Sequence, residues 1–254
     1  MVELVTVIAI ISLLTALVLP AVTAVRSQVL IGKSKSNLRQ LVQANLAHAL
    51  ANGGKLAFAT NEQNTKRWCA ALVSGRWDRT RGYLSPYLAY EAQIAVCPLL
   101  EELLPADGPS FELGTGGYGY NAAYLGGIDG RRRKKASLRL DQIADPSNTI
   151  MFATTAYARK DGVQEYPFTE PPFWNPNQAL AGGSPSPTTH FRANGQAIIG
   201  WADGRISLEA ANKHPPGQNP HGGDATAESL GWFGPTENNG HWNPANHWIR
   251  GKLR

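Results

Sequence analysis

The chain opens with Met1-Val-Glu-Leu-Val-Thr-Val-Ile-Ala-Ile-Ile-Ser-Leu-Leu-Thr-Ala-Leu-Val-Leu-Pro-Ala-Val-Thr-Ala-Val25, in which Glu3 is the one charged side chain. The apolar residues of this run fall on every side of a helix, whereas a helix half-buried on a globular core shows one apolar face. As a helix, the run from Leu4 to Val25 would be about 33 Å long, close to the hydrocarbon thickness of a bilayer. We therefore predict a membrane-spanning helix over 1–25.

Two residues in this run call for a separate explanation. Pro20 removes one backbone hydrogen bond, and we expect it to bend the helix near residues 16–20. Glu3 lies at the edge of the apolar run, where a carboxylate either reaches the lipid headgroups or pairs with a cation from another copy of the helix. The residue pattern leaves both interpretations of Glu3 open.

The sequence Val2-Glu-Leu-Val-Thr-Val-Ile-Ala-Ile-Ile11, followed by Pro20, closely resembles the N-terminal helix of type IV pilins and type II secretion pseudopilins. The resemblance implies a single-pass inner-membrane subunit with a periplasmic head, later packed by this helix into an extracellular or periplasmic filament. It also implies that Glu3 neutralises the N-terminal amine of a neighbouring subunit and that Pro20 bends or locally melts the helix. In that family a leader is cut before a Phe, the new N terminus is methylated, and the glutamate is fifth in the mature chain; here it is third.

The remainder of the chain divides into three predicted parts. The stretch 26–52 continues the helix with apolar residues at three- and four-residue spacing, and Asn52-Gly53-Gly54 is a stop signal. A globular head follows over 53–209, and an aromatic and histidine-rich tail over 210–254 is expected to cover the head or a neighbouring subunit. The predicted fold class is α+β and pilin-like: a long N-terminal helix, with a membrane half and an amphipathic half, packed on an antiparallel sheet with long loops.

Within the head, several segments carry a local prediction. We expect a short helix over 67–73, another over 81–88, and strands in 116–125 and 150–153. The Asp203-Gly204 dipeptide between two β-prone runs predicts a hairpin.

Further motifs resemble a pseudopilin-like group known from planctomycetes and verrucomicrobia. They are Asn37-Leu-Arg-Gln-Leu41, the pair Cys97-Pro98 followed by Tyr118-Gly-Tyr-Asn121, and the Asp203-Gly204 end of a His-x9-Asp-Gly signature. The position ten residues before Asp203 is Ala193, and the nearest histidine is His190. The signature is therefore only partly kept.

The two cysteines, Cys69 and Cys97, have two interpretations. A disulfide would close a loop of about 28 residues and stabilise the fold by ~3 kcal/mol in the chain-entropy model. Two small buried thiols explain the pair equally well. Neither cysteine belongs to a Cys-x-x-Cys pair, so they do not indicate a metal site.

The basic character of the chain is local. Its formal net charge is +5, and the run Arg131-Arg132-Arg133-Lys134-Lys135 alone supplies five positive charges. This run either caps a solvated hairpin or binds an anionic polymer through salt-sensitive contacts.

No nucleophile elbow, phosphate loop, zinc-protease motif or dinucleotide fingerprint occurs, so we predict no enzyme, no cofactor and no metal. The predicted function is a structural subunit of a pilus-like or pseudopilus filament. Its expected partners are copies of itself or other pilins, the inner membrane and the assembly machinery. The alternative is a membrane-tethered binding module for a glycan or an anionic polymer that does not polymerise.

Overall fold

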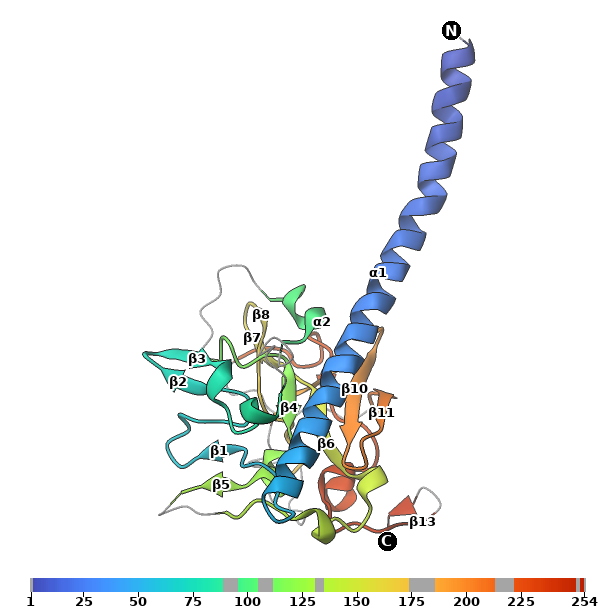
Figure 1. The fold of residues 1–254 in the computed structure, drawn as a ribbon. Helices are drawn as coiled ribbons and strands as arrows, with labels where there is room; N and C mark the ends of the chain where they lie inside the picture. Colours follow the sequence, from blue (N-terminus) through green and yellow to red (C-terminus); the bar gives the residue numbers. More distant parts are fainter. Residues whose placement is uncertain are drawn as a thin grey trace.

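The computed structural model describes residues 2–88, 96–104, 112–130, 135–173, 186–212, 222–249 and 252–253, without the side chains of 2, 17–21, 249, 252 and 253. One long helix, α1 (Val2–Ala51), packs along the head with its second half, and its first half projects away from the head (Figure 1). The head combines helices, short strands and one four-stranded sheet.

The second half of α1 is amphipathic, as the spacing of its apolar residues predicts. Ile31, Leu38, Leu41, Val42 and Ala49 are buried at three-, four- and seven-residue intervals, whereas Gly32, Lys33, Ser36, Arg39, Gln43 and Ala47 are exposed. The helix ends where Gly53 and Gly54 adopt φ values of +63° and +84°, and the Gly54 amide donates to the Ala49 carbonyl. The stop signal is confirmed.

The predicted membrane half of this helix is wrong. Within the part of the chain that the structure describes, no helix is both long and apolar enough to cross a bilayer. This finding corrects the predicted fold class and the predicted single-pass inner-membrane location: the fold mixes helix and sheet, and its described residues contain no candidate membrane span.

The main sheet has the strand order β11-β10-β6-β4, with every neighbouring pair antiparallel. Its strands are β4 (Tyr118–Tyr120), β6 (Ile150–Thr154), β10 (Gln196–Trp201) and β11 (Ile206–Ala210). The predictions of a strand over 150–153 and of the hairpin around Asp203-Gly204 are thereby confirmed. The strand predicted over 116–125 is confirmed only at 118–120, because 122–126 forms a helical turn.

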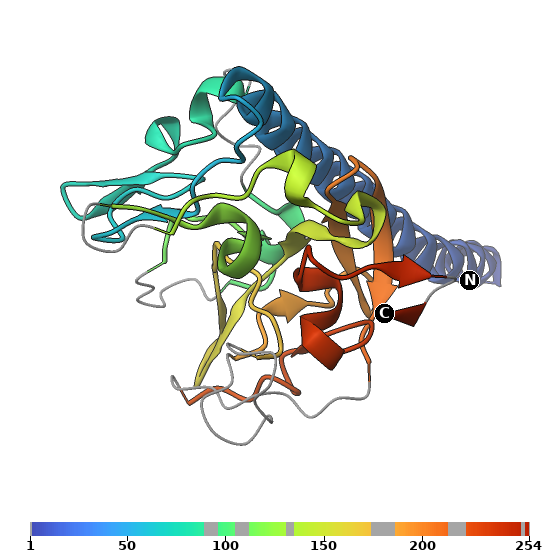
Figure 2. The same ribbon diagram turned by 90° about the horizontal axis from the view of Figure 1, so that it is seen from below.

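The sheet lies between the second half of α1 and the C-terminal tail (Figure 2). On the helix side, Gly200 of β10 permits close approach, because a Cβ there would lie 2.6 Å from Val42 Cγ2. On the other side, Ile199 and Trp201 of β10 belong to a buried cluster with Trp232, Phe233 and Trp242 from the tail. Alternation of side chains along β10 thus supplies two separate cores.

Smaller elements complete the head. The two-stranded pairs are β1 (Thr60–Asn61) with β5 (Ile128–Asp129), β2 (Ala71–Val73) with β3 (Arg76–Asp78), β7 (Tyr157–Arg159) with β8 (Gly162–Gln164), β9 (Thr189–His190) with β12 (Leu230–Gly231), and β13 (Trp248–Ile249) with β14 (Lys252–Leu253). The short helical turns are α2 (Pro98–Glu101), η1 (Arg79–Arg81), η2 (Ser85–Tyr87), η4 (Ala122–Gly126), η5 (Leu140–Gln142), η6 (Pro146–Asn148) and η7 (Glu237–Trp242).

The predicted helix over 67–73 is wrong, because its second half forms strand β2 of a hairpin. The turn residues Ser74 and Gly75 have φ values of +50° and +80°, the left-handed conformation that a tight two-residue hairpin loop requires. The helix predicted over 81–88 is reduced to the single turn η2, whose first residues include Pro86, and Arg81 ends the preceding turn η1.

Candidate functional site

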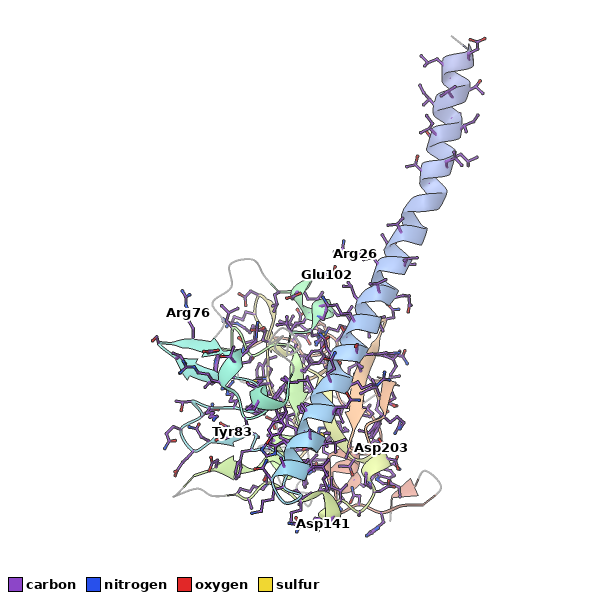
Figure 3. All side chains as sticks on the ribbon, viewed as in Figure 1. Arg26, Arg76, Tyr83, Glu102, Asp141 and Asp203 are labelled. Carbon is purple, nitrogen blue, oxygen red and sulfur yellow. The ribbon has the colours of Figure 1, made fainter. Side chains whose placement is uncertain are left out.

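In the projecting half of α1, residues 3–16 stand clear of the head with their apolar side chains exposed (Figure 3), whereas Arg26 and Ser27 contact Glu102 and Asn194 of the head. The term projecting half of α1 refers below to residues 3–16 and 22–29. Its exposed large hydrophobic residues, each between 52% and 66% exposed, are Leu4, Val5, Val7, Ile8, Ile10, Ile11, Leu13, Leu14, Val22, Val25 and Val29. At ~100° per residue, positions 4–14 point in all directions around the helix axis. The fold therefore leaves a continuous apolar surface around this part of α1.

The two residues assigned to assembly have different outcomes. Glu3 is exposed at the far end of the projecting half, and no hydrogen bond or ion pair joins it to another described residue. Pro20 lies among the residues whose side chains the structure does not describe, so its predicted role in bending the helix stays a prediction. The axis of α1 changes direction between the projecting and the packed half (Figure 1).

The family-signature turn joins β10 to β11 at the edge of the sheet. The Asp203 carboxylate accepts a hydrogen bond from the Arg205 amide at 2.9 Å, and Gly204 has a φ of +93°. Asp203 is exposed, and Figure 3 places it at the end of the head opposite the projecting half. This turn fixes the hairpin register, and it lies far from the apolar surface.

His190, the histidine nearest to the signature position, contacts Arg192 inside the head. Its Nδ1 lies 2.7 Å from an Arg192 Nη1, which also donates to the Thr155 carbonyl at 3.1 Å. Burial first, and then the charge of Arg192, lower the pKa of His190 to about 2. A neutral imidazole with Nδ1 as the acceptor follows, since a guanidinium only donates.

Arg192 also lines a pocket of about 320 Å³ at the root of the projecting half. The pocket lies between α1, where it leaves the head, and the segment of α2 and the turn after it. Its charged residues are Arg26, Glu102 and Arg192, and Arg26 pairs with Glu102 at 2.5 Å. Figure 3 shows Arg26 and Glu102 facing each other at this junction. No carboxylate in the described part of the chain pairs with Arg192, and its Nε atom is buried without a hydrogen-bond partner.

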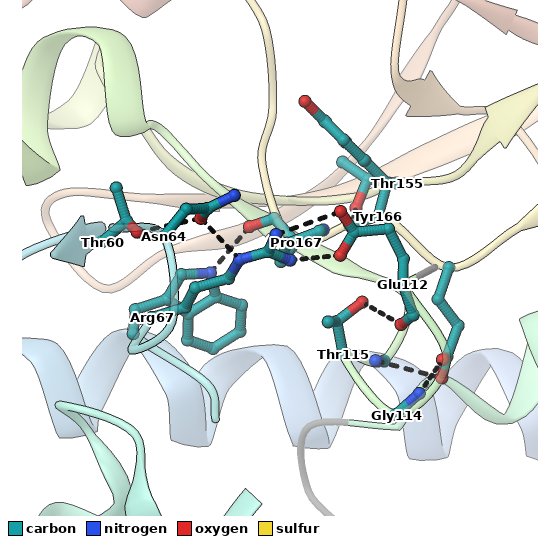
Figure 4. Close-up of polar contacts among 12 residues, drawn as sticks. Thr60, Asn64, Arg67, Glu112, Gly114, Thr115, Thr155, Tyr166 and Pro167 are labelled. Atoms are coloured by element: carbon teal, nitrogen blue, oxygen red, sulfur yellow. Dashed lines mark hydrogen bonds and ion pairs between the residues drawn. The ribbon is translucent and has the colours of Figure 1, made fainter. Parts of the chain in front are cut away.

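A second polar cluster lies inside the head (Figure 4). Arg67 and Glu112 form a two-point ion pair in which both side chains are only 4% exposed. The Arg67 Nε donates to Asn64 Oδ1 at 2.9 Å, and its guanidinium lies 4.1 Å from the Trp77 ring centre. Burial raises the pKa of Glu112, while Arg67 acts to lower it.

The neighbouring carboxylate, Glu165, fixes the loop 112–117. It accepts hydrogen bonds from the amides of Gly114 and Gly116, and Arg79 lies 3.5 Å from one of its oxygens. Each charge in this cluster thus has a partner. We interpret the cluster as structural, because it joins chain segments far apart in the sequence.

Cys69 and Cys97 are free thiols, and both are buried. The structure therefore agrees with the buried-thiol interpretation and corrects the disulfide interpretation: Cys97 Sγ contacts Ser34 Oγ of α1 at 3.6 Å, whereas Cys69 lies beside the Arg67 cluster. Burial raises the pKa of Cys69 to about 12.

The basic run is mostly outside the described residues. This applies to Arg131, Arg132, Arg133 and Lys134, and also to the tail histidines His214 and His221. Lys135 is described, and its ammonium donates to the Ala123 carbonyl. In the tail, His241 stacks on Trp248 with ring centres 4.5 Å apart. No group of His, Cys, Asp and Glu suited to a metal ion occurs within the described ranges.

Sequence reasoning missed Arg192, Glu102 and the Arg67–Glu112 pair. Each depends on contacts between segments at least 30 residues apart, and no motif marks them. A basic residue two positions after a strand histidine was the only local signal for Arg192.

Comparison of the chain with family models, with curated proteins and with solved structures finds no match in any of the three.

Proposed function

We propose that this protein is a structural subunit of a helical filament, of the pilus-like or pseudopilus-like type, in which the projecting halves of α1 from many copies form the core. The observation that carries the proposal is the exposed apolar surface around residues 4–14 of α1. The heads would then decorate the outside of the filament.

The distribution of the apolar residues favours several neighbours over one. A single partner helix would cover one side of the projecting half and leave the opposite side in water. Leu4, Ile8 and Ile11 lie on one side of α1, whereas Ile10 and Leu13 lie on the other. Both sides are covered only when each helix is surrounded by other helices, as in a filament core.

The energy available is large enough for assembly. Burying an exposed Val, Leu or Ile side chain contributes about 1.5–3 kcal/mol. The exposed residues of the projecting half are already about half covered by their own helix, so their burial would supply on the order of 10 kcal/mol per subunit. This gain offsets the entropy that each subunit loses on association.

Glu3 sets a condition on the packing. A carboxylate that enters an apolar core without a cation costs several kcal/mol, so a neighbouring copy must supply a positive group. The resemblance to pilins names the N-terminal amine of that copy.

Electron microscopy of the full chain tests the proposal. We expect filaments from the unsubstituted protein and none from Leu13→Asp, which places a charge on the projecting half, where Leu13 is 64% exposed. The matched control is Leu50→Asp, on the packed half of the same helix, where Leu50 is 80% exposed. Equal filament formation by both variants, or none by the unsubstituted protein, would contradict the proposal.

The alternative is a binding module that does not polymerise. Of the tryptophans in the described ranges, Trp68, Trp201, Trp232 and Trp242 are buried, and Trp77 and Trp248 are only partly exposed. This arrangement offers little aromatic surface to a glycan. A monodisperse full-length protein that binds a glycan or an anionic polymer would favour the alternative.

A further inference from the structure

The pocket at the root of the projecting half has an unbalanced charge. Arg26 and Arg192 supply two guanidinium groups, and Glu102 supplies one carboxylate, which is bound to Arg26 at 2.5 Å. One further carboxylate would neutralise the pocket. Arg192 Nη1 already donates to the Thr155 carbonyl and Nη2 to the Gly117 carbonyl, so its Nε, which is buried without a partner, is the guanidinium donor left for such a carboxylate.

The same pocket has apolar walls. Leu30 of α1, together with Leu99 and Leu103, lies beside the charged residues. A ligand that fits these walls carries its carboxylate next to aliphatic side chains. The pocket therefore suits the side chain of an acidic residue on an apolar helix better than it suits a small, fully polar acid.

The projecting half of α1 carries such a residue. Glu3 is the one acidic residue in the first 25 positions, and Leu4 and Val5 follow it directly. Glu3 and Arg26 are 23 positions apart on one helix, which corresponds to about 35 Å along the axis. A parallel copy displaced by about 35 Å would therefore bring its Glu3 beside Arg26.

We infer that this pocket receives the Glu3 carboxylate of a second copy, with Arg192 as its main cationic partner and Leu30, Leu99 and Leu103 against the apolar residues that follow Glu3. The inference rests on the proposed filament and adds an axial displacement of about 35 Å between contacting subunits. It also gives Glu3 a guanidinium partner in place of the terminal amine that the resemblance implies.

Cysteine cross-linking within filaments of the full chain tests the displacement. Leu4→Cys and Ser27→Cys variants, whose cysteines are also 23 positions apart, are mixed before assembly and oxidised afterwards. We expect a mixed disulfide between positions 4 and 27, identified by peptide mass spectrometry. The comparison pair is Leu4→Cys with Leu13→Cys, which reports a displacement of nine positions and is expected to give little mixed product.

Charge substitutions, added to the Leu4→Cys and Ser27→Cys chains, test the contact between the Glu3 carboxylate and Arg192. Glu3→Gln, on the exposed end of the helix, is expected to reduce the mixed product about fivefold, the factor that an ion pair of moderate strength supplies. Arg192→Gln is expected to act in the same direction, and Arg192→Lys, which keeps the charge, to restore part of the yield. Near-ultraviolet circular dichroism shows whether the head is folded in Arg192→Gln and in Arg192→Lys. If one of these two variants is unfolded, the result for Glu3→Gln alone decides the test.

The possible outcomes separate the two claims. Filaments without the 4–27 product, or with a product that Glu3→Gln leaves unchanged, would overturn this inference and leave the proposed filament in place. Absence of filaments from the unsubstituted chain would overturn the proposed function together with the inference.

Discussion

Gly200 of β10 lies directly against Val42 of α1, so that a Cβ at position 200 would come within 2.6 Å of Val42 Cγ2. Leu38 is the next helix residue in line, at 3.4 Å from the same position. The spacing between helix and sheet, and with it the direction in which α1 leaves the head, depends on the absence of a side chain at this one strand position.

Gly200→Ala should therefore destabilise the head by about 1–3 kcal/mol, the usual cost of an extra methyl group in a packed core. Urea unfolding of the full chain measures this change. Gly32→Ala is the matched control, because no atom lies within 4 Å of an added Cβ there and alanine favours a helix over glycine by ~1 kcal/mol. Equal effects of the two substitutions would show that the close contact at Gly200 has no energetic weight.

The Arg67–Glu112 pair should be costly to break. Glu112→Gln leaves the buried guanidinium of Arg67 without its counter-charge, and we expect a loss of about 3–5 kcal/mol in the free energy of unfolding. The exposed Arg139–Asp141 pair is the comparison, since its side chains are 44% and 64% exposed. Asp141→Asn should have a much smaller effect in the same denaturation experiment, because water screens an exposed ion pair. A small effect at Glu112 would contradict a tightly paired cluster.

His190 should make the head sensitive to acid. Its folded pKa of about 2 lies below the unfolded value of 6.5, so below that value the unfolded chain binds a proton that the folded chain does not. The stability is therefore fully present above pH 6.5 and declines as the pH falls toward 2, by about 2–3 kcal/mol by the time it reaches pH 4.5.

Thermal or urea unfolding across this pH range should give a shallower decline for His190→Gln than for the unsubstituted chain. The comparison of the two proteins removes the contributions of other groups, such as Glu170, whose pKa burial raises to about 7. His247→Gln, at an exposed histidine, is the control. Identical pH profiles for His190→Gln and the unsubstituted protein would count against the buried neutral imidazole.

The two thiols should be unreactive in the folded protein. Both are buried, and a pKa of about 12 leaves Cys69 almost entirely protonated, whereas the thiolate is the reactive form. A thiol reagent such as Ellman's reagent should detect no free thiol before unfolding and two afterwards, without a reductant. Detection of no thiol after unfolding would reveal a disulfide and contradict the structure.

Local patterns predicted the elements that depend on neighbouring residues. The end of α1 at Asn52-Gly53-Gly54, strand β6 and the turn at Asp203-Gly204 each follow from residue types within a few positions. The segment 67–73 was predicted wrongly because the hairpin turn at Ser74-Gly75 outweighs its helical pattern. The apolar run at the N terminus predicted a membrane span that the described residues do not contain.

The candidate site was only partly predictable. Glu3 and the apolar residues around it are visible in the sequence, because they form one uninterrupted stretch. Arg192 became visible only when folding placed it beside Arg26 and Glu102, which lie 166 and 90 positions before it. A pocket assembled from three distant segments leaves no periodicity or motif for sequence analysis to detect.

Sedimentation of the unsubstituted full-length chain at increasing concentration measures the central claim most directly. If the projecting half of α1 forms a filament core, the protein should pass from small species to large, fast-sedimenting polymers, and Leu13→Asp should abolish them. A single monomeric species at every concentration, with the projecting half of α1 intact, would contradict the account.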